Sequence, residues 1–325
     1  MLSIRKGKIM NVLIELPNWL GDCVMATPSI ENLVSVSKNA KITFIGPKTS
    51  TDIFLNHPNY HSSIESERRF YKFFKISLKL DKFDIFISYR NSLRARFFKR
   101  FISAGEKYQY NKKIFKSGHQ VEKYNNFINS ITKKNLSARD LIIYSKNITP
   151  KKKGTVGINP GASYGSAKRW TSNGFSELAF ELSKNFDILL FGTNQEFDLC
   201  SEIENYLIEN NAKNYRNLCG KTSIQELISE IGNLDLFVTG DSGPMHIAAA
   251  FQTPTISIFG PTRSTETSQW RNKFSKIVTK NLDCQPCMKR SCPLMHHNCM
   301  RLITPNEVLE ESLKLIREVK VDQMT

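Results

Sequence analysis

The pattern of apolar and polar positions predicts an open α/β arrangement in the first half of the chain. An apolar run over residues 9–16 indicates a buried strand, and a helical pattern follows at about 23–36 after a short polar loop. Strand-sized runs at 41–45 and 84–88 alternate with helical stretches. This order is typical of a parallel sheet covered by helices on both faces.

The same pattern starts again after a polar stretch at 145–154, which we interpret as a linker. Domains usually contain about 100 to 200 residues, so a chain of 325 residues suits two of them. We expect an N-terminal domain at 1–150, a C-terminal domain at 151–305 and a closing helix at 306–325 that could pack back across the domains. In the second half, strands are expected at 155–158, 187–191, 234–239 and 255–259, and helices near 172–185, 245–251 and 305–320.

Positive charge is concentrated in the first half. Residues 1–153 contain 29 Lys and Arg against 11 Asp and Glu, a net charge of +18, whereas the remainder, with 17 against 19, has −2. This asymmetry favours an anionic partner such as nucleic acid, a phosphorylated glycolipid or an acidic membrane surface. A lysine-rich, solvated surface is the alternative, although such a bias should act on both halves.

Apolar runs and cysteines favour a cytoplasmic protein. No run approaches the roughly 20 residues that are needed to cross a bilayer. Glu15 and Pro17 interrupt the apolar run near the N-terminus, and no small-residue cleavage site follows, so we expect no secretory signal. The seven cysteines are an odd number, and Cys23, Cys200 and Cys219 stand alone, which suits reduced thiols.

The dipeptide Gly21-Asp22 ends the loop after the first strand, where an open α/β domain presents its site. Gly21 would let the backbone turn there without steric cost. The carboxylate of Asp22 could serve as a base. Taken alone, however, Asp22 is equally a cap for the helix that follows.

Residues 159–170 (NPGASYGSAKRW) join a strand to a helix through small residues, hydroxyls and two cations. Backbone N–H groups and a helix N-terminus favour an anion, Ser163 adds a hydroxyl, and Lys168 could neutralise a diphosphate leaving group. The loop matches neither the dinucleotide fingerprint nor the Walker sequence, which disfavours a nicotinamide cofactor and an NTPase. A flexible turn with a solvated Lys-Arg pair is the alternative.

Residues 238–246 (VTGDSGPMH) form a second strand-to-helix turn, with an acid, a hydroxyl and an imidazole. The helix N-terminus could hold the same diphosphate from the other side. Asp241 or Ser242 could instead cap that helix, and a lone histidine is more often packed than catalytic. The candidate residues are Asp241, Ser242, Gly243 and His246.

Four cysteines and two histidines are crowded into residues 284–299. A structural zinc site is chemically possible there. The spacing does not match the usual paired arrangement, so reduced cysteines packed in an ordered loop are an equal alternative. The possible ligands are Cys284, Cys287, Cys292 and Cys299.

Three segments together resemble one family: PNWLGDCVMATP at 17–28, NPGASYGSAKRW at 159–170 and TGDSGPMH at 239–246. They are similar to the ADP-heptose:lipopolysaccharide heptosyltransferases, most closely the heptosyltransferase II subgroup. The resemblance implies a GT-B fold, with two Rossmann-like domains whose parallel sheets face a central cleft. It also implies an inverting reaction without a metal or other cofactor, and the chain contains no Asp-x-Asp motif.

On this resemblance, L-glycero-D-manno-heptose would move from ADP-heptose to the first heptose of a lipid A–Kdo–heptose acceptor. Asp22 would be the general base that takes the proton of the acceptor hydroxyl. Lys168 and the backbone of residues 241–243 would stabilise the departing ADP, and the aspartate there would contact the heptose. His246 would support that loop, and Glu196 could bind the ribose hydroxyls.

Such an acceptor carries phosphates and carboxylates, which would give the basic half a specific partner. Charges more than about 10 Å apart are largely screened, so only clustered cations should matter. The enzyme would work in the cytoplasm in peripheral contact with the anionic inner membrane, with no specific nucleic acid. The arginines that we expect at the acceptor are Arg68, Arg69, Arg90, Arg94, Arg96 and Arg100.

Three other hypotheses stay open. Another heptosyltransferase of the same family, such as heptosyltransferase I, would differ only in its acceptor. A non-catalytic protein that binds nucleic acid or another anion would leave the two diphosphate-type loops unexplained, and no recognised nucleic-acid motif is present. A sugar-nucleotide sensor with the same fold would have no use for Asp22.

Overall fold

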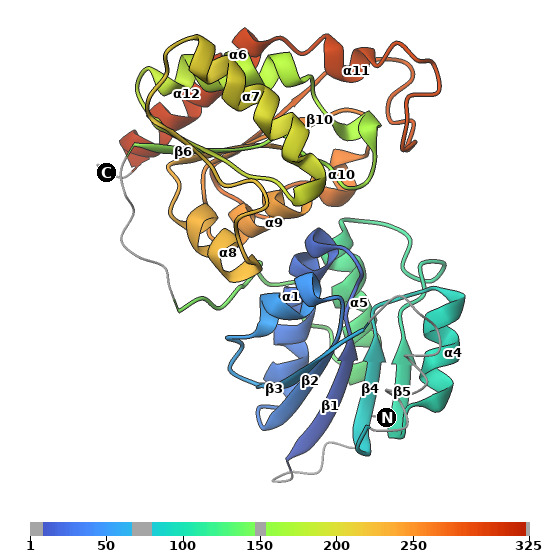
Figure 1. Ribbon diagram of the computed structural model, residues 1–325. Helices are drawn as coiled ribbons and strands as arrows, with labels where there is room; N and C mark the ends of the chain where they lie inside the picture. The colour runs from blue at the N-terminus through green and yellow to red at the C-terminus, as the bar shows by residue number, and fades with distance from the viewer. Residues whose placement is uncertain (1–8, 67–79, 147–153, 323–325) are drawn as a thin grey trace. The chain divides into compact units, whose positions relative to one another are not determined.

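The computed structural model describes residues 9–66, 80–146 and 154–322. The chain divides into two compact units, Met1–Lys146 and Asn147–Thr325 (Figure 1). Each unit contains one parallel sheet with helices packed on it. Two α/β units, expected from the repeated strand and helix pattern, are thereby confirmed.

The first unit contains a five-stranded parallel sheet in the order β3-β2-β1-β4-β5. Strand β1 lies in the middle because Val12 to Glu15 are buried on both faces, as an apolar run predicts. The strand order reverses between β1 and β4, and such a switch point is where open α/β sheets bind ligands. The strands are β1 (Met10–Glu15), β2 (Ala40–Gly46), β3 (Tyr60–Glu65), β4 (Phe83–Ser88) and β5 (Ala104–Gln109).

Helices cover the first sheet. The long α1 packs against α5, which begins with a capping box formed by His119 and Glu122. Helix α1 begins at Leu20, earlier than the sequence pattern indicated, so Asp22 lies in its first turn. The helices are α1 (Leu20–Val36), α2 (Lys48–Thr51), α4 (Leu93–Phe101) and α5 (Gln120–Thr132), with a 3-10 turn η1 (Asp52–Phe54).

The second unit contains a six-stranded parallel sheet in the order β11-β10-β9-β6-β7-β8. Strand β6 is flanked by β7 and β9, so its switch point lies beside β9, and Asn159 is the register partner of Thr239. The two motif loops therefore leave neighbouring strands at the same edge. The strands are β6 (Thr155–Asn159), β7 (Asp187–Leu190), β8 (Tyr215–Asn217), β9 (Leu236–Gly240), β10 (Thr255–Phe259) and β11 (Ser275–Thr279).

The helices of the second unit lie on both faces of its sheet, with α6, α7 and α12 on one side and α8 and α9 on the other (Figure 1). The 3-10 turns are η2 (Ser166–Lys168) and η3 (Asn194–Glu196). The helices are α6 (Ser172–Ser183), α7 (Phe197–Glu209), α8 (Ile224–Gly232), α9 (Gly243–Ala250), α10 (Ser264–Thr267), α11 (Asn298–Arg301) and α12 (Pro305–Asp322).

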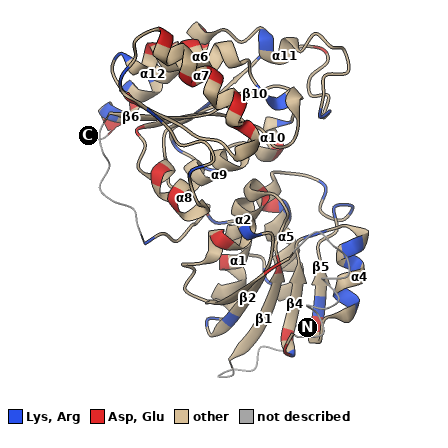
Figure 2. Cartoon of the chain, viewed as in Figure 1, with Lys and Arg blue, Asp and Glu red and all other residues tan. Residues whose placement is uncertain are grey.

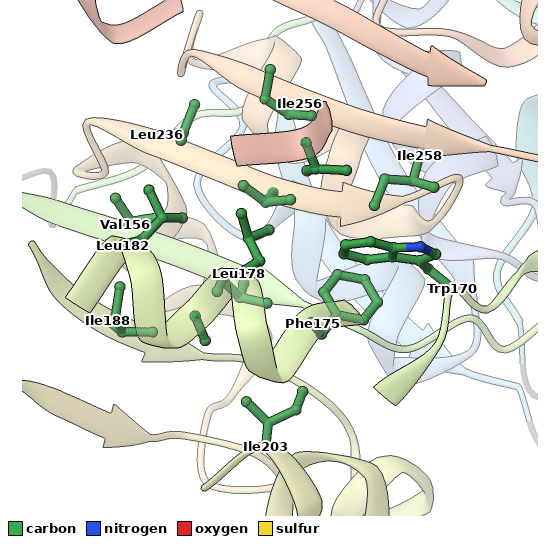
Figure 3. Close-up of a cluster of buried hydrophobic side chains, with 14 of the residues drawn as sticks. Val156, Trp170, Phe175, Leu178, Leu182, Ile188, Ile203, Leu236, Ile256 and Ile258 are labelled. Atoms are coloured by element: carbon green, nitrogen blue, oxygen red, sulfur yellow. The ribbon is translucent and has the colours of Figure 1, made fainter. Parts of the chain in front are cut away.

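The core of the second unit joins α6 and α12 to the sheet. Figure 3 shows Trp170 beside Phe175, and their ring centres are 4.9 Å apart. The indole N–H of Trp170 donates to the carbonyl of Ile303 at 2.9 Å, just before α12 begins. Val308 and Leu315 of α12 are fully buried in the same cluster. The closing helix is therefore part of the second unit's core.

Among the helices of the described residues, none combines the length and the apolar character that crossing a bilayer requires.

Candidate active site

Two loops of the second unit are joined by hydrogen bonds at the carboxyl ends of β6 and β9. The side-chain amide of Asn159 donates to the hydroxyls of Thr239 and Ser242, each at 3.3 Å. These two hydroxyls lie 3.0 Å from each other. The loops that the sequence singled out separately therefore form one polar site.

Lys168 and Asp241 form a buried ion pair in this site. Their Nζ and Oδ2 atoms are 2.5 Å apart, and only 12% and 5% of the two side chains are exposed. Lys168 also donates to the backbone carbonyl of Asp241 at 3.3 Å, and the Thr262 hydroxyl donates to the Asp241 carboxylate at 2.6 Å. Lys168 and Thr262 thus both fix the Asp241 carboxylate. The positive charge of Lys168 is paired with that carboxylate in the absence of a ligand.

Helix α9 begins at Gly243, two residues after Asp241, so its N-terminus lies beside the ion pair. Ser242 is the N-cap residue with an extended backbone, and its side chain makes no capping hydrogen bond. The first backbone N–H groups of a helix and its dipole favour an anion. His246 is buried within α9, with 3% of its side chain exposed, which suits the supporting position expected for it.

Ser163 lies in the loop after β6, whereas Glu196 lies in the 3-10 turn η3 after β7. Ser163 is exposed. The Glu196 carboxylate is buried and accepts hydrogen bonds from the backbone N–H and hydroxyl of Thr193 at 2.7 and 2.6 Å, which closes a capping box. A Cβ at Gly161 would lie 2.4 Å from this carboxyl. Glu196 thus shapes the loop, and its contact with a ribose stays a prediction.

The four cysteines at 284–299 do not assemble into a metal site. Within the described ranges, no group of three or more His, Cys, Asp or Glu residues is arranged to hold a metal ion. Cys299 is buried at the start of α11, whereas the other three are half-buried in the preceding loop. Burial raises the pKa of the Cys299 thiol to about 11, so it is neutral at neutral pH. The structure gives no support for a zinc ion there.

In the first unit, Asp22 accepts a hydrogen bond from a buried tyrosine. The hydroxyl of Tyr124 in α5 lies 3.1 Å from Oδ1 of Asp22. Edge-on contacts with Tyr89 and Tyr110, each at 5.1 Å between ring centres, fix the Tyr124 ring. Burial, together with the Asp22 charge, raises the pKa of Tyr124 well above its usual value. Tyr124 therefore keeps its proton and donates to a carboxylate in the first turn of α1.

A buried ion pair underlies the loop after β1. Glu15 is 1% exposed and accepts from the Ser88 hydroxyl at 2.5 Å, with Arg90 Nη1 at 3.5 Å. Burial raises the pKa of Glu15, and the charge of Arg90 opposes this rise. Arg90 also donates to the carbonyl of Leu16 at 2.6 Å. Arg90 was expected at the acceptor. Its side chain is only 9% exposed, and it stabilises the loop after β1 through the bond to Leu16.

The other predicted arginines differ in position. Arg94 is half-buried in the first turn of α4, whereas Arg96 and Arg100 are exposed on that helix. Figure 2 shows basic residues gathered on α4, which contains no acidic residue. Arg68 and Arg69 lie outside the described residues.

Two contacts of the site were missed by the sequence patterns. Thr262 follows the buried strand β10, and a hydroxyl at that place is a signal that could have been used. Tyr124 is part of no motif and lies 102 residues from Asp22. Only the packing of α5 on α1 brings it there.

Comparison with known proteins identifies the family. Residues 130–297 match the family described as Glycosyltransferase family 9 (heptosyltransferase). The chain is 38% identical to a lipooligosaccharide heptosyltransferase 2 of Campylobacter jejuni over 95% of this chain and 99% of that protein. The chain belongs to glycosyltransferase family 9. It is therefore a glycosyltransferase, and the resemblance seen in the three motifs is confirmed.

Further members of the family agree with this assignment. The lipopolysaccharide heptosyltransferase 2 of Escherichia coli K12 is 31% identical over 48% of this chain and 45% of that protein. The solved structure of E. coli ADP-heptose lipopolysaccharide heptosyltransferase II has a TM-score of 0.80 at 21% identity, over 96% of this chain and 100% of that one. An E. coli heptosyltransferase solved with ADP gives 0.74 at 16% identity, over 94% and 100%. The expected GT-B-type fold is confirmed.

Proposed function

We propose that this family 9 glycosyltransferase moves L-glycero-D-manno-heptose from ADP-heptose to the first heptose of the lipopolysaccharide inner core. The observation that carries the proposal is the buried pair of Lys168 and Asp241 beside the N-terminus of α9. The name heptosyltransferase 2 of the Campylobacter relatives, which match along nearly the whole chain, supports the choice of acceptor.

The donor diphosphate binds, in this proposal, where the loops after β6 and β9 meet. Lys168 and the backbone N–H groups at Ser242 and Gly243 stabilise the negative charge that develops as ADP departs. Ser163 and Ser242 offer hydroxyls to the phosphates, and Asp241 contacts the heptose. The relative solved with ADP supports a nucleotide of this kind.

Asp22 acts as the general base. The acceptor hydroxyl oxygen attacks the anomeric carbon, the bond from that carbon to the diphosphate oxygen breaks, and the hydroxyl proton passes to the Asp22 carboxylate. Attack opposite the departing diphosphate inverts the anomeric centre. The first turn of α1 and the hydroxyl of Tyr124 both favour the ionised carboxylate that this step requires.

The phosphates and carboxylates of the acceptor bind basic residues of the first unit, and we place them near α4. Arg96 and Arg100 are exposed there and Arg94 is half-buried. Their charges also suit peripheral contact with the anionic inner membrane, because each cation near such a surface contributes about 1 kcal/mol.

Release of ADP tests the proposal. ADP-heptose is offered with an acceptor that carries one heptose and with an acceptor that carries none, to wild type, Asp22→Asn and Asp198→Asn. Asp198 is an exposed carboxylate in the first turn of α7 and serves as the matched control. We expect release only with the one-heptose acceptor, a loss of about a hundredfold to ten-thousandfold in Asp22→Asn, and a change below about twofold in the control.

Two results would contradict this proposal. Preference for the heptose-free acceptor would assign the enzyme to the preceding transfer. Absence of release with either acceptor would favour a sensor or a binding protein.

A further inference from the structure

The cysteine-rich loop, residues 282–297, packs on the loop after β6. Ala167 is held at both backbone groups: its N–H donates to the carbonyl of Arg290 at 3.0 Å, and its carbonyl lies 3.0 Å from Nε2 of His297. Because a carbonyl only accepts, that ring nitrogen carries the proton. The Tyr164 hydroxyl donates to the carbonyl of Met288 at 3.1 Å. The loop that carries Lys168 therefore rests on the cysteine-rich loop.

The cysteine-rich loop also holds the segment after β10. The backbone N–H of Met288 donates to the carbonyl of Pro261 at 2.8 Å, and the side-chain amide of Gln285 donates to the carbonyl of Gly260 at 2.7 Å. Thr262, which follows Pro261, donates to the Asp241 carboxylate. The cysteine-rich loop thus joins two of the segments that fix the ion pair of the donor site.

This loop places a second cation, Arg290, against the Tyr164 ring that Lys168 also contacts. The Arg290 guanidinium carbon is 5.2 Å from the ring centre of Tyr164, and Nζ of Lys168 is 4.8 Å from the same centre. The Arg290 side chain is exposed, whereas the charge of Lys168 is already matched by Asp241. A diphosphate that binds beside Lys168 needs positive charge that is not already paired.

We propose that Arg290 binds the donor diphosphate as its second cationic contact, and that the cysteine-rich loop is the element that positions it. This rests on the proposed function, because it assumes that the donor is a nucleoside diphosphate sugar. A guanidinium suits the role, since its planar fork donates two hydrogen bonds to phosphate oxygens. Contact with the Tyr164 ring restricts the side chain before the ligand binds, which lowers the entropy lost on binding.

Calorimetric titration of the full-length protein with ADP and with adenosine tests this role. The variants are Arg290→Gln, Arg290→Lys and Lys289→Gln. The Lys289→Gln variant is the control, because it removes one positive charge from the adjacent exposed residue. The Arg290 carbonyl and its bond to Ala167 remain in every variant. We expect Arg290→Gln to weaken ADP binding by about tenfold to hundredfold, the size of a hydrogen bond to a charged group, and to leave adenosine binding unchanged.

Arg290→Lys should recover part of the ADP affinity, and Lys289→Gln should stay within about twofold of wild type. Equal weakening of ADP and adenosine would mean that the side chain only maintains the loop, and would overturn the proposal. Wild-type affinity in Arg290→Gln, or an equal loss in Lys289→Gln, would overturn it too while leaving the proposed function standing. Absence of ADP binding to the wild type would contradict both.

Discussion

Tyr124 and Asp22 are 102 residues apart in the chain and share one hydrogen bond in the structure. A carboxylate that accepts a hydrogen bond keeps its charge to lower pH. In Tyr124→Phe the ring contacts remain and the hydrogen bond is lost, so the base becomes protonated at higher pH. We expect the acid limb of the pH profile of kcat/KM to move up by about one to two pH units, since such a bond is worth about 1.5–3 kcal/mol.

The pH profile separates this role from a purely structural one. Tyr60→Phe removes an exposed hydroxyl whose partner is Ser63, and its profile should match that of the wild type. An unchanged acid limb in Tyr124→Phe, even with a lower kcat, would show that Tyr124 only packs α5 against α1.

The ion pair of Lys168 and Asp241 has a consequence for stability in the absence of any ligand. Lys168→Met leaves a carboxylate that is 5% exposed without its cation. We expect the free energy of unfolding, measured by urea denaturation, to fall by about 3–5 kcal/mol, the usual result of breaking a buried pair. The double variant Lys168→Met with Asp241→Asn should recover part of this loss, because no buried charge remains.

An exposed ion pair is the matched control for that experiment. Lys273 pairs with Asp322 at 2.6 Å, but their side chains are 62% and 43% exposed. Lys273→Met should change the free energy of unfolding by no more than about 1 kcal/mol. If Lys168→Met lowered the free energy of unfolding by as little as Lys273→Met, we would conclude that water solvates the Asp241 carboxylate. The ion pair would then not be a preformed part of the site.

Helix α4 is the element at which the acceptor proposal is tested. Arg96→Gln with Arg100→Gln removes two exposed cations and leaves the buried Ala95 and Phe98 in place. We expect KM for the phosphorylated acceptor to rise about threefold to tenfold at low ionic strength, because exposed pairs contribute up to about 1 kcal/mol each. The difference should diminish at high salt, where such charges are screened.

Donor kinetics and a second double variant provide the control for α4. The KM for ADP-heptose should stay unchanged in the α4 variant. Arg301→Gln with Arg317→Gln removes two exposed cations from the second unit and should leave acceptor KM as it is. A rise of equal size in both double variants would indicate a general effect of net charge and would exclude α4 as the acceptor surface.

Elements differ in how far the sequence predicts them. Strands β1, β6 and β10 lie inside their sheets, so their residues are buried and read as continuous apolar runs. The edge strands β5 (AGEKYQ) and β8 (YRN) carry polar residues, because one side of an edge strand has no neighbouring strand, and the pattern did not indicate them. Predictability therefore follows the position of a strand in its sheet.

Site residues show the same division. The loops at 159–168 and 240–246 were predictable, because small residues and charges between a strand and a helix are a local signal. The bond from Tyr124 to Asp22 and the contact of Arg290 with Tyr164 depend on residues far apart in the chain. No local pattern encodes such contacts. The sequence thus indicated the polar loops of the proposed donor site and the candidate base, but not the groups that contact them.

At the scale of the whole molecule, the division into two units agrees with the division of charge. Residues 1–146, which form the first unit, contain 26 Lys and Arg against 11 Asp and Glu, a net charge of +15, whereas the second unit has 20 against 19, a net charge of +1. The positive charge available to the proposed anionic acceptor therefore belongs to the first unit, and the loops of the proposed donor site belong to the second.

The packing of α12 has a consequence for the order of events during synthesis. This helix buries Val308 and Leu315 against a core that includes α6 and the central strands, and Trp170 donates to the carbonyl of Ile303 just before it. On the ribosome, the second unit cannot close its core until residues beyond 305 have emerged. The first unit contains its own complete sheet and can fold earlier, since domains generally fold as units from the N-terminus. During synthesis, the basic first unit can therefore be folded before the second unit, with the proposed donor site, has closed its core.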